Sequence, residues 1–121
     1  PGALDLAGRL TLPGVIGLLS RSALFLGNDS GPRHIAAAVG TPTVGVFTNA
    51  NLADVAPLAR TWHRLAVSWR SACSLCGLGF LEGECGHGET VLADVEVDEV
   101  SALAVDLWAQ VLAAGRLPGS V

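Results

Sequence analysis

The chain reads Gly27-Asn28-Asp29-Ser30-Gly31-Pro32-Arg33-His34 between two apolar runs, residues 23–26 and residues 35–39. This order predicts a buried strand that ends, turns through glycines and leads into a helix. The first backbone N–H groups of such a helix have no partner within the helix, and together with the helix dipole they favour an anion such as a phosphate. The stretch therefore predicts a phosphate or nucleotide site. The alternative is that Asp29 or Ser30 serves only as a structural helix cap.

The rest of the chain alternates helices and strands. The first predicted elements are a helix capped by Thr11 that ends near residues 21–22, a strand over residues 23–26 and a helix over residues 31–39 stopped by Gly40. Strands over residues 43–47 and 64–68 follow, and then a final helix that is capped by Asp98 and ends at Gly115. The predicted buried face of this last helix consists of Val100, Leu103, Ala104, Leu107, Trp108, Val111 and Leu112. Strands separated by helices imply an α/β fold with a parallel sheet, whose ligands bind beyond the carboxyl ends of the strands. Residues 27–34 and 47–51 both lie at such ends.

Composition limits the kind of protein. The 121 residues are 50% hydrophobic and carry seven Lys and Arg against eleven Asp and Glu, a formal net charge of −4. This is enough apolar sequence for one buried core, and the scattered basic residues offer no surface for nucleic acid. No apolar run reaches the ~18 residues that a membrane helix needs. The chain starts at Pro1 and contains no methionine, so we expect it to be a fragment.

Residues 24–44 carry a more specific pattern. Asp29-Ser30-Gly31 is followed by His34 after two residues, and then by the turn Gly40-Thr41-Pro42-Thr43. This pattern resembles the signature of bacterial heptosyltransferases, the lipopolysaccharide glycosyltransferase family nine, and residues 5–9 resemble a loop of the same family. The resemblance implies that residues 1–121 form a single, truncated C-terminal domain that binds a nucleotide sugar. Such a domain is a Rossmann-like parallel sheet flanked by helices, one half of a GT-B fold.

The resemblance also implies a role for four residues of the loop, Asp29, Ser30, Gly31 and His34. Ser30 and Gly31, with the amides that open the helix, would hold the diphosphate of a nucleotide-sugar donor of the ADP-heptose type, and Gly31 would let the backbone approach closely. Asp29 would orient the turn or contact the sugar. His34 would donate a hydrogen bond to phosphate or sugar. These four are the predicted donor-binding residues.

The same resemblance implies that the catalytic residue belongs to an N-terminal domain, which we expect to lie outside residues 1–121. The full-length protein is expected to be an inverting glycosyltransferase that transfers the sugar to lipopolysaccharide or to another glycan or lipid-linked acceptor, whereas the 121 residues alone are expected to be inactive. No cofactor is expected, and the expected location is the cytoplasm, at the inner membrane for the full-length protein. A fragment without its partner domain is expected to form homo-oligomers or to be poorly soluble.

Two features depart from the family. The loop Thr48-Asn49-Ala50-Asn51 replaces a loop of the Gly-Pro-Thr type, and Arg33 stands where the family more often has an apolar residue. We expect Arg33 to be a solvated side chain of the first helical turn rather than a phosphate contact. These departures keep a second function open, that of a non-catalytic Rossmann-like domain that binds a phosphorylated ligand or a protein.

Three cysteines and a histidine form a separate group. Cys73, Cys76, Cys85 and His87 offer a CxxC pair, a third thiol and an imidazole within a glycine-rich loop over residues 71–89. Such a set can close a tetrahedral zinc site, although its second half lacks the usual paired spacing. One disulfide with a free thiol, or three reduced thiols, are the alternatives, and a reducing cytoplasm favours thiols. No metal is therefore included among the predicted site residues.

Overall fold

Three parallel strands form the sheet at the centre of the protein. The computed structural model describes residues 2–50 and 52–116. Its elements are, in chain order, α1 (Leu12–Ser20), β1 (Phe25–Asn28), α2 (Gly31–Ala38), β2 (Thr43–Thr48), α3 (Leu52–Val55), β3 (His63–Ser68) and α4 (Val97–Ala113). The strand order is β1-β2-β3, and both pairs are parallel. The predicted α/β class, a Rossmann-like parallel sheet flanked by helices, is confirmed.

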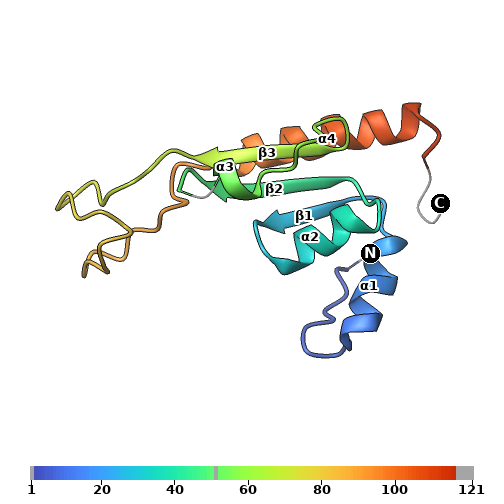
Figure 1. Ribbon diagram of the computed structural model, residues 1–121, viewed down its shortest axis with the longest axis horizontal. Coiled ribbons are helices and arrows are strands. Elements are labelled where there is room, and N and C mark those ends of the chain that lie inside the picture. The colour runs from blue at the N-terminus through green and yellow to red at the C-terminus, as the bar shows by residue number, and fades with distance from the viewer. Residues whose placement is uncertain (1, 51, 117–121) are drawn as a thin grey trace.

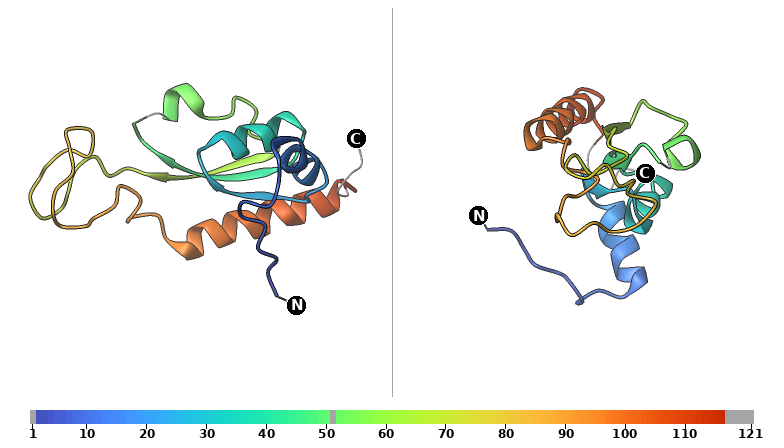
Figure 2. Two further views of the ribbon diagram at one scale, coloured as in Figure 1. Left: turned by 90° about the horizontal axis from the view of Figure 1, so that it is seen from below. Right: turned by 90° about the vertical axis from the view of Figure 1, so that its left-hand side faces the viewer.

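Helices α2 and α4 cover opposite faces of the sheet (Figure 1 and Figure 2, left). Because side chains alternate along a strand, the central strand β2 contributes to both faces. Gly45 faces α2, since a Cβ on this residue would lie 2.9 Å from Cδ of Arg33. Val44 and Val46 point to the other face, where Val44 is fully buried and Val46 shares a shallow hollow with Val97.

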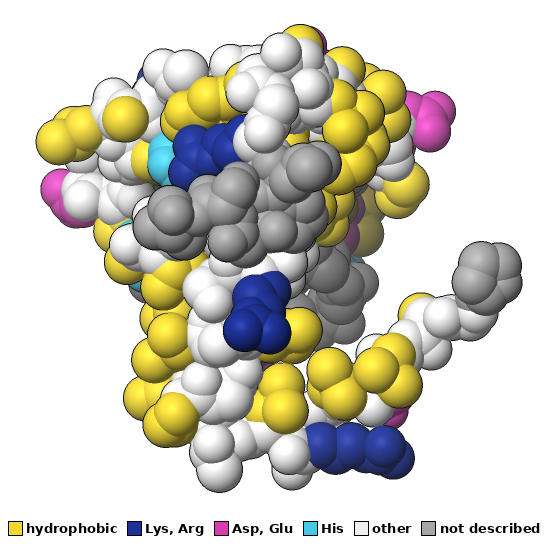
Figure 3. Space-filling view, turned by 90° about the vertical axis from the view of Figure 1, so that its right-hand side faces the viewer, with side chains coloured by type: hydrophobic (Ala, Val, Ile, Leu, Met, Phe, Trp, Pro, Cys, Tyr) yellow, Lys and Arg dark blue, Asp and Glu magenta, His cyan; other side chains and the backbone are white. Residues whose placement is uncertain are grey.

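Helix α1 begins as predicted. The hydroxyl of Thr11 accepts a hydrogen bond from the Gly14 N–H at 3.4 Å, and Pro13 lies in the first turn. The helix packs on α2 through its buried residue Leu19. Figure 3 shows hydrophobic side chains spread over the end of the molecule that carries α1. The exposed apolar side chains of this region are Leu4, Leu10, Leu12, Ile16 and Leu18.

Strand β1 starts two residues later than the predicted range of 23–26. Its pairing with β2 begins at Phe25, opposite Thr43, and the Phe25 N–H donates to the Pro42 carbonyl at 2.9 Å. Residues 23 and 24 belong instead to the connection that follows α1. The partner strand, rather than the apolar run, decides where this strand begins. β2, β3 and α2 agree with the prediction to within one residue.

A glycine follows each of the two helices that pack on the sheet, α2 and α4. Gly40 follows α2 with a φ of +84°, and Gly115 follows α4 with a φ of +63°, as predicted for the left-handed conformation at these positions. The predicted start of α4 at Asp98 is wrong, because the N-cap is Glu96. Asp98 lies in the first turn beside Glu99, where negative charge favours the positive end of the helix dipole.

The buried face of α4 is narrower than the predicted one. Leu107 and Val111 are fully buried, whereas Trp108 and Leu112 are 36% and 51% exposed. The helix lies against β3 and β2, so only the residues that point directly at these strands are covered. The apolar pattern therefore identifies the helix but overestimates how much of it packs.

Residues 69–96 form a long loop that projects from the sheet, yellow to orange in Figure 1. All of these residues are described and none belongs to a helix or a strand, although Ala72 and Gly79 form an isolated antiparallel bridge. Between β2 and β3 the short helix α3 interrupts the predicted polar loop, whose residue Asn51 lies outside the described residues. No helix in the described part of the chain is long and apolar enough to cross a membrane.

Candidate functional site

The loop between β1 and α2 lies at the carboxyl end of β1 and carries Asp29, Ser30, Gly31 and His34. The Asp29 N–H donates to the Val46 carbonyl at 2.8 Å, which continues the β1–β2 pairing past the end of the strand. The loop is thereby fixed to the central strand. Its position at the edge of a parallel sheet is the one where ligands of α/β proteins bind.

The start of α2 has few free donors. Ser30 is the N-cap by backbone conformation, but its hydroxyl donates to the Asn28 carbonyl at 3.1 Å instead of capping the helix. Pro32 has no N–H, and the Arg33 N–H already donates to the Ser30 carbonyl at 3.0 Å. Within the described residues no hydrogen bond engages the Gly31 N–H, and a Cβ at Gly31 would meet no atom within 4 Å. Gly31 is exposed, and its amide has no hydrogen-bond partner among the described residues.

The predicted solvated state of Arg33 is wrong. Arg33 is only 1% exposed, and its guanidinium lies over the ring of Phe47, 5.0 Å from the ring centre. Its Nε donates to Oδ1 of Asp29 at 2.9 Å, and its Nη2 donates to the Val55 carbonyl at 3.0 Å. Burial is possible because Gly45 has no side chain and leaves room for the stem of Arg33. Two sequence signals could have indicated it, namely the spacing of four between Asp29 and Arg33 on one helical face and a glycine in the central strand.

Asp29 lies between two basic groups. Its side chain is 10% exposed and is paired with Arg33, while Nε2 of His34 lies 3.5 Å from the same carboxylate oxygen. The imidazole of His34 is 52% exposed and also lies 3.1 Å from Nη2 of Arg33. Of the three side chains, His34 is thus the one with a large open face.

A pocket of about 340 Å³ opens at the carboxyl ends of β2 and β3. It is lined by the loop after β2, by the residues after β3 and by the long loop, namely Thr48, Asn49, Ala50, Arg70, Ser71, Phe80, Leu81 and Val91. The guanidinium of Arg70 lies 5.8 Å from the ring centre of Phe80 and pairs with Glu89 at 2.6 Å. The loop that departs from the family pattern therefore forms one wall of a pocket, and the cysteine-bearing loop forms the other.

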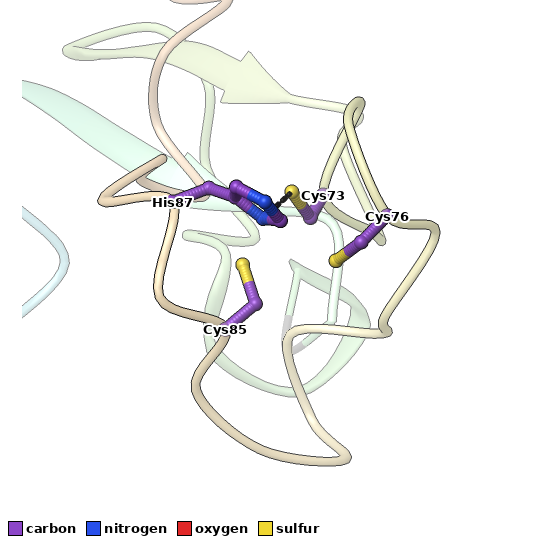
Figure 4. A group of neighbouring side chains, drawn as sticks. All are labelled: Cys73, Cys76, Cys85 and His87. Carbon is purple, nitrogen blue, oxygen red and sulfur yellow. Dashed lines mark hydrogen bonds between the residues drawn. The ribbon is translucent and has the colours of Figure 1, made fainter.

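The long loop brings Cys73, Cys76, Cys85 and His87 together (Figure 4). One potential ligand atom from each of the four lies within 4.8 Å of every other, and Sγ of Cys73 is 3.7 Å from Nδ1 of His87. All three cysteines are free thiols in the described structure. The arrangement matches the four-residue set identified in the sequence and does not contain the alternative disulfide.

Glu89 holds the turn that carries the CxxC pair. Its carboxylate accepts hydrogen bonds from the hydroxyl of Ser74 at 2.6 Å, from the Ser74 N–H at 2.8 Å and from Arg70. The hydroxyl and then the amide of Ser74, with smaller contributions from Cys73 and the charge of Arg70, lower the pKa of Glu89 to about 2. The side chain is therefore an ionised acceptor at neutral pH. It connects the turn at Ser74 to Arg70, two residues after the end of β3.

The part of the chain that resembles known proteins contains all three strands and the loop between β1 and α2. The profile of glycosyltransferase family 9 (heptosyltransferase) matches residues 2–74. Lipopolysaccharide heptosyltransferase 3 of Escherichia coli is 47% identical over 47 residues, which are 39% of this chain and 14% of that protein. Lipopolysaccharide core heptosyltransferase OpsX of Haemophilus influenzae is 40% identical over 53 residues, 44% of this chain and 15% of that protein. The matched segments are thus a small part of these relatives. No solved structure matches the chain at a comparable level.

Proposed function

The chain belongs to glycosyltransferase family 9, the heptosyltransferase family, and on that premise we propose that it is the C-terminal, donor-binding part of a glycosyltransferase. In this proposal the Rossmann-like sheet is one half of a GT-B fold and holds the diphosphate of a nucleotide sugar of the ADP-heptose type. The acceptor is lipopolysaccharide or another glycan. The reaction inverts the configuration of the sugar carbon, because the acceptor hydroxyl attacks the donor directly and the nucleoside diphosphate leaves.

The observation that carries this proposal is the Gly31 amide at the start of α2, which has no hydrogen-bond partner among the described residues. A diphosphate oxygen placed there accepts a hydrogen bond from this N–H and lies at the positive end of the helix dipole, and no side chain on Gly31 blocks its approach. His34 is one helical turn further on and half-exposed, and both of its ring nitrogens lie 3.1 Å from Nη2 of Arg33. A turn of this ring toward the ligand would let it donate to a second phosphate oxygen or to the sugar. The hydroxyl of Ser30 donates to the Asn28 carbonyl and thereby helps to orient the turn.

Asp29 has the role of a positioning residue in this proposal. A free carboxylate beside a diphosphate would repel it, but the carboxylate of Asp29 is paired with the buried guanidinium of Arg33. Of its two predicted roles, this pairing favours orientation of the turn over contact with the sugar. Arg33 therefore contributes to phosphate binding indirectly, because its positive charge offsets the negative charge of Asp29.

In this proposal, catalysis requires residues that are not among the 121 of this chain. The base that activates the acceptor is proposed to come from an N-terminal domain, as membership of the family implies. The isolated chain is then inactive and binds the donor weakly. A cytoplasmic enzyme at the inner face of the membrane is the setting in which both substrates meet.

An amide-shift titration of the 121-residue chain with ADP, GDP and UDP tests the proposal. We expect saturable shifts centred on residues 29–34, weakened at least several-fold by His34→Ala and by Gly31→Ala, and unchanged by Ser101→Ala on the exposed side of α4. Gly31→Ala should leave the folded spectrum intact, since a Cβ there would meet no atom within 4 Å. Absence of shifts with all three nucleotides at millimolar concentration would reject donor binding by this domain and favour the non-catalytic alternative.

A further inference from the structure

We propose that Cys73, Cys76, Cys85 and His87 bind one zinc ion, and that this structural site holds the wall of the pocket at the carboxyl ends of β2 and β3. The proposal concerns the loop that follows β3 and does not depend on donor binding at residues 29–34. Most of this loop lies beyond residue 74, where the family match ends.

The first argument is the convergence of four donors of the right chemistry. In a tetrahedral site with Zn–S near 2.3 Å and Zn–N near 2.0–2.1 Å, neighbouring ligand atoms lie about 3.5–3.8 Å apart. Sγ of Cys73 and Nδ1 of His87 are 3.7 Å apart, and the ligand atoms of the four residues are all within 4.8 Å of one another. Figure 4 shows the side chains of Cys76 and Cys85 directed toward the same space as those of Cys73 and His87. A small contraction is enough to reach bonding distances.

The second argument is the backbone around the CxxC pair. The Cys73 N–H donates to the Leu78 carbonyl and the Gly77 N–H donates to the Cys73 carbonyl, each at 2.9 Å. This tight turn is completed by Gly77 in the left-handed conformation, with a φ of +74°. The turn places the two thiols on one side, where a single ion can contact both. Gly77 allows it because other residues rarely adopt a positive φ.

The third argument is that the loop is held by side-chain contacts and isolated hydrogen bonds rather than by regular structure. Residues 69–96 form no helix or strand, and Cys73 is the one member of the four that is buried. Ordering a loop of this length without regular structure costs a large conformational entropy, and a metal that cross-links two of its segments through four ligands reduces that cost. The ion would join the turn at residues 73–76 to the distant segment at residues 85–87.

The donor set selects among metals. Three thiolates and one imidazole are soft and borderline ligands, which favour zinc over the oxygen-preferring magnesium and calcium. All four positions are supplied by the protein, so no coordination site is left open for water or substrate, as is typical of structural rather than catalytic zinc. Three thiolates on Zn²⁺ give a net charge of −1, and the neighbouring Arg70 and Glu89 form an ion pair that adds no net charge.

A disulfide would account for the positions of only two of these four residues. Joining any two of the cysteines leaves the third thiol and His87 without a function, although all four ligand atoms lie together. The three thiols are unpaired in the structure. Coordination of one ion explains the position of every member of the group, whereas a disulfide explains two.

Metal analysis of the chain purified under reducing conditions tests the proposal. We expect one zinc per chain by mass spectrometry of the metals, and the absorption bands of tetrahedral, thiolate-bound cobalt after replacement of zinc by Co²⁺. Cys85→Ser should lower the bound zinc at least tenfold, whereas Glu84→Gln, a neighbouring exposed residue, should retain one equivalent. His87→Cys should also retain the metal, because four cysteines form an equally suitable set.

Outcomes that would overturn the proposal are equally defined. The proposal fails if the fully reduced wild-type protein binds neither zinc nor cobalt, or if the bound metal is iron. It also fails if protein isolated from the cytoplasm contains a Cys73–Cys76 disulfide, or if Cys85→Ser retains its full zinc content. If Cys85→Ser fails to fold, the metal content and cobalt spectrum of the wild-type chain still decide between these cases.

Discussion

Arg33 and Asp29 form an ion pair across the first turn of α2, with Nε 2.9 Å from Oδ1 and with the two side chains only 2% and 10% exposed. A pair so shielded from water has lost most of its hydration, and each partner then depends on the other. The pair belongs to the same turn as the proposed diphosphate site. The stability of the domain and the geometry of its loop are therefore linked through the same two side chains.

We expect Asp29→Ala to lower the free energy of unfolding by about 3 kcal/mol, because it leaves the buried guanidinium of Arg33 without a counter-charge. The double variant Asp29→Ala, Arg33→Met should lose clearly less than the sum of the two single changes. Denaturant unfolding of the four proteins measures this coupling. Additive losses would show that the pair contributes no coupling energy.

Gly45→Ala should destabilise the domain by about 1–3 kcal/mol through overpacking. The new Cβ would lie 2.5 Å from Cε2 of Phe47 and 2.9 Å from Cδ of Arg33, so both side chains must move. The matched control is Gly17→Ala in α1, where a Cβ meets no atom within 4 Å and where alanine should stabilise the helix by up to about 1 kcal/mol. Equal effects of the two changes in thermal unfolding would contradict the close packing at Gly45.

The unfolding free energy should fall as the pH drops below about 6.5, in part because of His63. Burial, and then the charges of Arg33 and Arg116, lower the pKa of His63 below its usual value of 6.5, and its Nδ1 lies 2.9 Å from the hydroxyl of Thr43. Between the folded and the unfolded pKa the unfolded state binds more protons, so stability is complete above pH 6.5 and decreases as the pH falls through the folded pKa.

His63→Gln should remove this part of the pH dependence. Urea unfolding of both proteins at pH 7.5 and at pH 5.5, with the same metal content, gives the comparison. The difference between wild type and variant should be larger at pH 7.5 than at pH 5.5. A difference that does not change with pH would contradict the lowered pKa.

Glu89→Ala should weaken zinc binding about 10–100-fold without removing a ligand. The carboxylate holds the amide and hydroxyl of Ser74, the residue between the first two cysteines, so its loss frees the turn. Competition with a coloured zinc chelator measures the affinity. Glu84→Ala, which lies beside Cys85 and is exposed, should bind as the wild type does, and a similar loss in both variants would point to loop charge rather than to the turn.

Self-association of the isolated chain should increase with concentration. Leu12 and Ile16 are 62% and 39% exposed, lie one turn apart on α1 and form part of an apolar surface. The double change Leu12→Gln, Ile16→Gln should reduce association in light scattering more than Val105→Gln on α4 does. A wild-type chain that is monomeric at every concentration would reject this expectation.

The sequence predicted the fold well because local signals and topology agree in it. The Thr11 cap, the stop at Gly40 and the apolar run before Gly115 each reflect one short segment, and such segments suffice to order helices and strands. The start of β1 at Phe25 was missed because it depends on the register with Thr43 in another strand.

The site was predicted less completely. The donor loop could be recognised from a contiguous motif, but the burial of Arg33 depends on space beside Gly45, twelve residues further along the chain, and on the ring of Phe47. The cysteines could be identified as a set, yet their spacing could not decide between metal, disulfide and free thiols. That choice requires the three-dimensional convergence of their side chains.

The environment of Arg33 also limits how far residues 29–34 could be transplanted. The arginine requires a glycine in the adjoining strand, an aromatic ring two residues after it and the carbonyl of Val55 in a separate segment. Grafted onto another sheet without these partners, the six residues would carry a cation into an interior with no room for it. The loop is therefore not a portable module, and an engineered version would have to carry Gly45, Phe47 and α3 along with it.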